Sequence, residues 1–137
     1  MTASALRGIA RSASEVDRLD GAPVVMARDA DQWEAWLTDH HQEPAGAWLV
    51  IAKKNTGATT VTQPEALDGA LCFGWIDSVR RSLDATYYLQ RYSRRRRGSA
   101  WSTINGNRAE ALAAAGRMHE AGLAEVERAK AAGRFQT

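Results

Sequence analysis

The most densely charged part of the sequence is an arginine-rich segment that runs into a Gly-Ser loop. Seven arginines lie between residues 80 and 97, against one acid, Asp84. Guanidinium groups bind phosphate and carboxylate through paired hydrogen bonds, and the start of the helix expected next adds free N–H groups. The pattern therefore favours an anionic ligand, although a solvated basic loop with a core tryptophan is the alternative interpretation. The side chains expected to bind the ligand are Arg91, Arg95, Trp101, Ser102 and Asn105.

A second group of candidate residues surrounds Gly74, where a helix is expected to end and a strand to begin. Asp77 is the candidate catalytic residue, because a fixed carboxylate beside arginines can act as a general acid or base. Trp75 would add an aromatic wall and contact the ligand. In the alternative interpretation Phe73 and Trp75 belong to the core and Asp77 pairs with an arginine. Cys72 falls on the apolar side of the helix, which predicts a buried, unreactive thiol.

Two lysines form the third group. Lys53 and Lys54 follow a continuous apolar run at residues 47–52, which predicts a buried strand. Strand ends often border binding sites, so both lysines are candidate ligand contacts, although a charged strand end also arises simply by facing solvent. The three histidines lack the spacing of metal ligands, and no nucleotide-binding or nucleophile motif occurs. We therefore predict neither a metal site nor a cofactor.

The elements that must position these residues follow from periodicity and capping signals. Two strands and two helices are expected to alternate up to Gly74, the second helix beginning with a Thr62–Glu65 capping box. A pair of strands and two further helices follow. The order β-α-β-α-β-β-α-α predicts an α+β fold, with a small antiparallel or mixed sheet and helices on one side. The expected ranges are 22–27, 29–41, 47–52, 62–73, 76–97 for the strand pair, 99–118 and 123–132.

Length and composition predict one globular domain. The chain has 137 residues, of which 45% are hydrophobic and 25% charged. Residues 1–20 have weak periodicity and are expected to form a flexible tail, which leaves residues 21–137 as a single domain. One cysteine fits a reducing compartment, and no signal or membrane-spanning segment is evident, so we expect a cytoplasmic protein with no membrane partner. An exposed strand edge would allow a dimer, but the sequence leaves the oligomeric state open.

Several sequence blocks together resemble one known family. Over roughly residues 24–135 their order and spacing are similar to the N-terminal domain of the bacterial bacteriocin-protection family, also called YdeI/OmpD-associated. The chain departs from that pattern at Ser78, where Gly is usual, and at Arg94 and Arg97, where Pro is usual. The matching blocks are Trp33-Glu34-Ala35-Trp36-Leu37, Ala47 to Lys54, Glu65 to Asp77, Tyr88-Leu89-Gln90-Arg91-Tyr92, Ser99-Ala100-Trp101-Ser102 with Asn105, Gly116-Arg117-Met118 to Ala121-Gly122-Leu123, Ala129-Lys130 and Gly133-Arg134-Phe135.

The resemblance implies a fold of the frataxin-like (YjbR/CyaY) group, in which a small curved antiparallel sheet packs against helices. It implies no settled enzyme activity. The family is associated with protection against toxic compounds, and related YjbR-like proteins with antibiotic resistance. The resemblance therefore implies a role in binding a drug or a metabolite.

Three functional hypotheses result. The first is a protein that binds a small aromatic or anionic molecule, such as an antibiotic or a metabolite, in a cleft and protects by sequestering it. The second is an enzyme that acts on such a compound, with Asp77 as acid or base and arginines stabilising negative charge. The third is a nucleic-acid or protein interaction module that uses residues 91–97. Nucleic acid is the less favoured partner, because no helix carries the arginines.

Overall fold

The computed structural model describes residues 17–96, 98–99 and 101–135. Most of the predicted tail (residues 1–20) lies outside these ranges, but residues 17–19 form a short strand that the sequence analysis missed. The strands are β1 (Asp17–Leu19), β2 (Ala22–Met26), β3 (Ala47–Ala52), β4 (Trp75–Ser82) and β5 (Tyr87–Arg94). The helices are α2 (Ala30–His40), α3 (Gln63–Cys72), α4 (Thr103–Ala114) and α5 (Glu120–Ala131).

The five strands form one open, mixed sheet in the order β1-β2-β3-β5-β4. The general α+β class is confirmed, and the sheet is mixed, which is one of the two alternatives expected from the sequence. The purely antiparallel sheet implied by the family resemblance holds for only three of the four strand pairs. The pair β2–β3 is parallel, with Val25 opposite Leu49. The reason is local: α2 connects these strands by crossing one face of the sheet, so the chain re-enters the sheet in the same direction.

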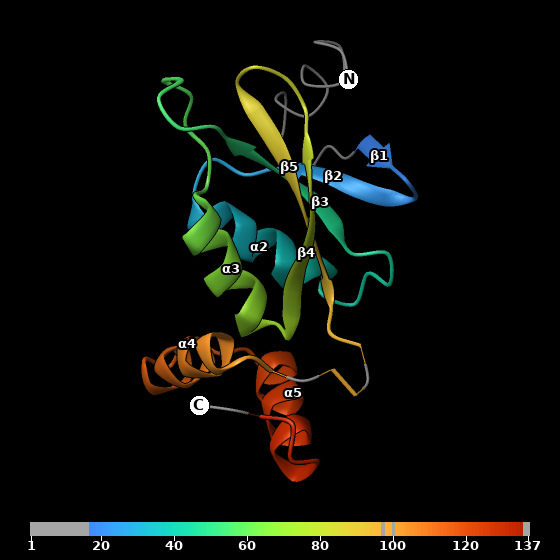
Figure 1. Cartoon of the computed structure of the whole chain (residues 1–137), viewed down its shortest axis with the longest axis vertical. Coiled ribbons are helices and arrows are strands. Elements are labelled where there is room, and N and C mark those ends of the chain that lie inside the picture. Colours follow the sequence, from blue (N-terminus) through green and yellow to red (C-terminus); the bar gives the residue numbers. More distant parts are fainter. Residues whose placement is uncertain (1–16, 97, 100, 136–137) are drawn as a thin grey trace.

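The main core lies between the sheet and the helices α2 and α3, which cover one face (Figure 1). Trp33 and Trp36 stack on each other with ring centroids 5.7 Å apart, and Tyr92 from β5 packs against Trp33. Their spacing along α2 places both tryptophans on the helix side that faces the sheet. The core therefore fixes the two central strands relative to α2 and α3.

A second apolar cluster occupies the opposite face of the sheet, because successive strand residues point to alternate sides. Trp48 is its largest member and is buried. The guanidinium groups of Arg81 and Arg91 lie over the Trp48 ring, with the guanidinium carbon 5.1 and 5.2 Å from the ring centroid. Part of the arginine-rich segment thus covers this cluster.

The helices α4 and α5 lie beyond one end of the sheet, next to the end of α3 (Figure 1). The chain turns from α3 into β4 at Gly74, whose φ of +78° favours glycine. The backbone N–H of His119, the N-cap of α5, donates to the Cys72 carbonyl oxygen at 2.9 Å. These contacts hold α5 against the end of α3. None of the described helices is long and apolar enough to span a membrane.

Candidate functional site

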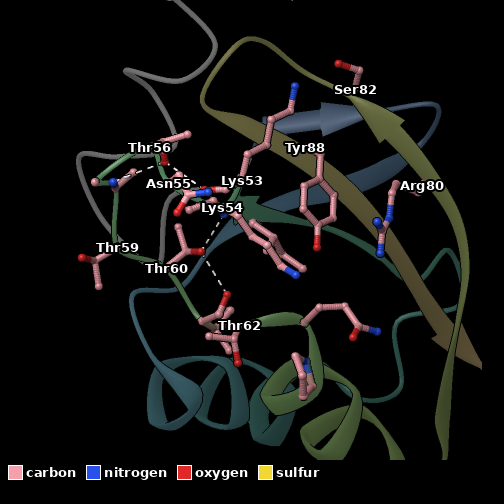
Figure 2. Close-up of a pocket in the computed structure, with 17 residues that line it drawn as sticks. Lys53, Lys54, Asn55, Thr56, Thr59, Thr60, Thr62, Arg80, Ser82 and Tyr88 are labelled. Carbon is pink, nitrogen blue, oxygen red and sulfur yellow. Dashed lines mark hydrogen bonds between the residues drawn. The ribbon is translucent and has the colours of Figure 1, made fainter.

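Two clefts each contain two of the predicted ligand residues, and a third cleft is lined by another of these residues, Arg91. The first, called here the β3–α3 cleft, has a volume of about 830 Å³. It lies between the loop at residues 53–62, the first turn of α3 and the neighbouring ends of β4 and β5. Figure 2 shows Tyr88 and Arg80 extending from the sheet towards the side of the cleft that carries Thr60 and Thr62. Two predicted ligand residues, Lys53 and Lys54, line this cleft.

Threonine hydroxyls fix the loop that forms one wall of the β3–α3 cleft. Thr60 is only 9% exposed, and its hydroxyl accepts from the Ala52 N–H at 2.8 Å and donates to the Val61 carbonyl at 2.9 Å. The Thr56 hydroxyl donates to the Lys53 carbonyl at 3.0 Å (Figure 2). Because these bonds join the loop to the end of β3, the wall has a defined shape without a ligand.

The charges that line the β3–α3 cleft are all positive: Lys53, Lys54 and Arg80. Lys53 Nζ is directed away and donates to the Asp84 carbonyl oxygen at 2.6 Å. Arg80 lies over the Tyr88 ring, with its guanidinium carbon 4.4 Å from the centroid. Neither Lys54 nor Arg80 forms an ion pair with an acid among the described residues. The cleft therefore offers cations, hydroxyl groups and an aromatic ring.

The start of α3 borders the β3–α3 cleft but is already capped. The Thr62 hydroxyl accepts from the Glu65 N–H at 3.4 Å, and the Glu65 carboxylate accepts from the Thr62 N–H at 3.0 Å. This confirms the predicted capping box. Because a carboxylate occupies the helix N-terminus, that terminus is not available to a ligand anion.

The second cleft, called here the arginine pocket, has a volume of about 790 Å³. It lies between the chain that follows β5 and the C-terminal half of α5. Two predicted ligand residues, Arg95 and Trp101, line it. The only acid among the described residues of its lining is Glu125, which forms an ion pair with Arg128. The arginines of the lining are Arg94, Arg95, Arg96, Arg128 and Arg134.

Arg95 is the most buried of these arginines, at 9% exposure. Its backbone N–H donates to the Gly74 carbonyl at 3.2 Å, and its guanidinium carbon lies 3.8 Å from the Trp101 ring centroid. The buried Nε has no hydrogen-bond partner. Burial lowers the pKa of Arg95 to about 10, and the negative charges of Glu125 and Asp77 partly oppose that shift. Arg95 is therefore a charged group at neutral pH that forms no ion pair with a carboxylate of the described residues.

The other predicted residues are not gathered around either cleft. Trp75 is completely buried, and its Nε1–H donates to the His41 carbonyl at 2.8 Å. Asp77 lines neither cleft and lies opposite Tyr92 in the β4–β5 pair. Arg91 projects from the other face of the sheet over Trp48 and donates to the Ala45 carbonyl at 2.6 Å.

The residues at the start of α4 have structural roles in this arrangement. The Ser102 side chain is the N-cap and accepts from the Asn105 N–H at 3.1 Å. Neither residue lines the clefts described above. Cys72 is buried as predicted, and burial raises the pKa of its thiol to about 11. Among the described residues, no group of three or more His, Cys, Asp or Glu side chains could hold a metal ion.

Many lining residues were not among the predicted ligand residues, and four of them, Tyr88, Arg80, Arg128 and Arg134, show why. The sequence analysis places Arg80 in the arginine-rich segment and Tyr88 on a strand, but the adjacency of the two depends on the register of β4 against β5, which contains a bulge between Asp77 and Arg80. Arg128 and Arg134 are more than 30 positions from Arg95 in the sequence, and only the packing of α5 brings them to the same pocket. The alternation of Tyr88, Gln90 and Tyr92 was the available signal for the inward position of Tyr88.

Comparison with known proteins identifies the family. A model of DUF8412, a domain of unknown function, matches residues 25–125. The chain belongs to the DUF8412 family. The DUF8412 match contains the whole β3–α3 cleft and ends at Glu125, so Arg128 and Arg134 of the arginine pocket lie outside it. No curated protein and no solved structure matches the chain.

Proposed function

We propose that this protein binds a small anionic molecule with an aromatic or apolar body in the β3–α3 cleft. The observation that carries the proposal is a cleft of about 830 Å³ whose charged lining residues are Lys53, Lys54 and Arg80. That volume lies within the range typical of small-molecule sites, which is about 300–1,000 Å³. Positive charges with no facing acid favour a ligand that supplies the negative charge.

The lining suggests how the ligand would be oriented. Ile51 and Val61 are buried apolar residues at the cleft, and the Tyr88 ring adds an aromatic surface. Lys54 and Arg80 would bind the anionic group, and hydroxyl groups of the threonine-rich loop would bind further polar atoms. A planar aromatic acid or a similar metabolite has this combination of an apolar body and an anionic group.

Binding is favoured over catalysis by the composition of the cleft. Among the described residues, its lining contains no Asp, Glu, His or Cys, which are the usual acids, bases and nucleophiles of enzymes. Asp77, the candidate catalytic residue, lies elsewhere on β4. We therefore propose protection by sequestration of an antibiotic or a toxic metabolite. The reason for a protective role is the resemblance to the bacteriocin-protection family and its frataxin-like relatives.

The proposal is tested with neighbouring arginines that point to opposite faces of β4. Arg80 lines the cleft, whereas Arg81 covers Trp48 on the other face and pairs with Asp20 at 2.9 Å. The probe is 8-anilinonaphthalene-1-sulfonate, an aromatic anion whose fluorescence rises on binding. Arg80→Gln should weaken its binding by about tenfold, because a charge-assisted hydrogen bond is lost. Arg81→Gln removes the same charge and should change the affinity by less than about twofold.

Native mass spectrometry of protein purified from its own host would identify a natural ligand. A bound small molecule that is retained by the wild type and lost in Arg80→Gln supports the proposal. Equal weakening of the dye by both substitutions would instead indicate a general charge effect, and the proposal would then be abandoned.

A further inference from the structure

We propose that the arginine pocket is a second binding site, which takes the phosphate group of a small molecule. The site is independent of the β3–α3 cleft, because the two clefts share no lining residue. It also goes beyond the proposed function, which makes no use of α5 or of the chain that follows β5. Failure of one proposal therefore leaves the other standing.

The first observation is the buried guanidinium of Arg95. The side chain is nine-tenths buried, lines the pocket, and has an Nε with no hydrogen-bond partner. A buried charge is normally paired, because an unpaired one loses its hydration without compensation. A phosphate group in the pocket would provide the missing negative charge beside this guanidinium.

The second observation is that the surrounding chain holds Arg95 in place. Its backbone N–H is bonded to Gly74, and its guanidinium is stacked on Trp101. Trp101 is itself fixed, since its backbone N–H donates to the Arg134 carbonyl at 3.0 Å. The bond between Trp101 and Arg134 also brings the end of the described chain to the pocket. Arg95 is thus positioned before any ligand arrives, which reduces the entropy lost on binding.

The third observation is the excess of positive charge. Among the described residues, five arginines line the pocket against one acid, and Glu125 is already paired with Arg128. No described acid forms an ion pair with the other four arginines. A carboxylate has two oxygens, whereas a phosphate monoester has three acceptor oxygens and up to two negative charges, and so can accept from several guanidinium groups.

The aromatic residues favour a small phosphate compound over a nucleic acid. Trp101 is 2% exposed, with Arg95 over its ring and Phe135 at a centroid distance of 5.2 Å. Single-stranded nucleic acids are usually bound by stacking bases on accessible aromatic rings. Trp101 cannot serve that purpose while Arg95 covers it, so the pocket recognises the phosphate group and not a base.

The experiment is an NMR titration of the full chain with inorganic phosphate, at constant ionic strength maintained with chloride. We expect saturable shifts of signals from residues of the arginine pocket. Signals from the β3–α3 cleft should shift much less at the same phosphate concentrations, because phosphate lacks the apolar body of the ligand proposed for that cleft. Arg95→Gln should weaken phosphate binding by at least about tenfold, because it removes a charged double donor. Arg95→Lys retains the charge but loses the paired geometry, so its affinity should lie between those of Arg95→Gln and the wild type.

The matched control is Arg117→Gln, which removes an exposed arginine outside the pocket, where it pairs with Glu34 at 3.2 Å. Its phosphate affinity should stay within about twofold of the wild type. If Arg95→Gln does not fold, the exposed Arg134 provides the same test through Arg134→Gln, with an expected loss of several-fold. Equal weakening by Arg117→Gln, or shifts that do not saturate, would overturn the proposal.

A second arm identifies the source of the phosphate. A single-stranded RNA of twelve nucleotides is titrated at matched phosphate concentration across a salt series. We expect it to compete weakly. Tight RNA binding that displaces inorganic phosphate and falls steeply with salt would overturn the small-molecule assignment, because it is the behaviour of a nucleic-acid surface.

Discussion

The contact between α5 and the end of α3 can be tested at Gly122, a helical glycine near the start of α5. A Cβ added there would lie 2.2 Å from the Cys72 carbonyl oxygen and 2.7 Å from its carbonyl carbon. An ordinary carbon–oxygen contact is about 3.3–3.6 Å, so Gly122→Ala would require α5 to move by about 1 Å. The atoms that the added methyl group would meet belong to the backbone of Cys72, so they cannot rotate away as a side chain could.

Two opposing effects determine whether Gly122→Ala raises or lowers the free energy of unfolding. Alanine is favoured over glycine inside a helix by about 1 kcal/mol, which alone would stabilise the protein. Overpacking against rigid atoms typically costs about 1–3 kcal/mol, and moving α5 also stretches the bond from His119 to Cys72, worth about 1 kcal/mol. We therefore expect Gly122→Ala to lower the free energy of unfolding by about 1–3 kcal/mol.

Urea unfolding followed by circular dichroism measures the effect. The control is Ala124→Gly, at an exposed position two residues along the same helix, which should lose about 1 kcal/mol from helix propensity alone. Replacing glycine with alanine at position 122 and alanine with glycine at position 124 should thus both lower the free energy of unfolding. A Gly122→Ala protein as stable as the wild type would refute the close approach of α5 to Cys72. Because α5 carries part of the arginine pocket, Gly122→Ala should also weaken phosphate binding there and leave the β3–α3 cleft unaffected.

Two further predictions concern residues outside the clefts. The thiol of Cys72, with its pKa raised to about 11 by burial, should be thiolate in roughly one molecule in a thousand at pH 8. Ellman's reagent should therefore label the native protein far more slowly than the urea-unfolded protein, and rapid labelling of the native state would show that the thiol is accessible. Ser102→Ala should lower the free energy of unfolding by about 1 kcal/mol through loss of the N-cap, with phosphate affinity within about twofold of the wild type. A large loss of affinity at unchanged stability would identify Ser102 as a ligand residue.

Much of the fold could be predicted from local signals. The apolar run at residues 47–52, the Thr62–Glu65 capping box and the paired tryptophans of α2 each specify an element without reference to distant residues. The parallel pairing of β2 with β3 and the strand β1 depend on contacts between segments, which periodicity does not encode. The start of α5 was expected at Leu123 but occurs at Glu120, because the His119 side chain accepts from the Ala121 N–H and acts as the N-cap.

The candidate site was harder to predict than the fold, because the type of a residue does not reveal the direction in which its side chain points. Arg80 and Arg81 are adjacent and identical in chemistry, yet one lines the β3–α3 cleft and the other covers Trp48. Tryptophan suggested a ligand wall at Trp75, but the ring is completely buried in the main core. The bulge in β4 changes the side to which later residues point, so a simple alternation from Trp75 onward gives the wrong face beyond Asp77.

Substitution of the buried Arg95 distinguishes a role of this residue in ligand binding from a role in the stability of the fold. Its pKa is lowered to about 10 because burial disfavours the charged form, so the folded state carries this unfavourable contribution throughout the neutral range. Stacking on Trp101 offsets part of it, by about 0.5–2 kcal/mol. Arg95→Met keeps the packing volume without the charge, and should be as stable as the wild type at pH 7 or more stable by about 1 kcal/mol, while phosphate binding is lost.

The stability of the wild type relative to Arg95→Met should change with pH in a defined direction. Above about pH 10 the folded state would release the proton of Arg95 before the unfolded chain does, so the stability of the wild type should rise relative to Arg95→Met. Urea unfolding of both proteins at pH 7 and above pH 10 measures this difference. If Arg95→Met is instead less stable by 2 kcal/mol or more at pH 7, on the order of a lost buried ion pair, Arg95 supports the fold and its burial is no argument for a ligand. A stable Arg95→Met protein that no longer binds phosphate would show that Arg95 serves ligand binding and not the stability of the fold.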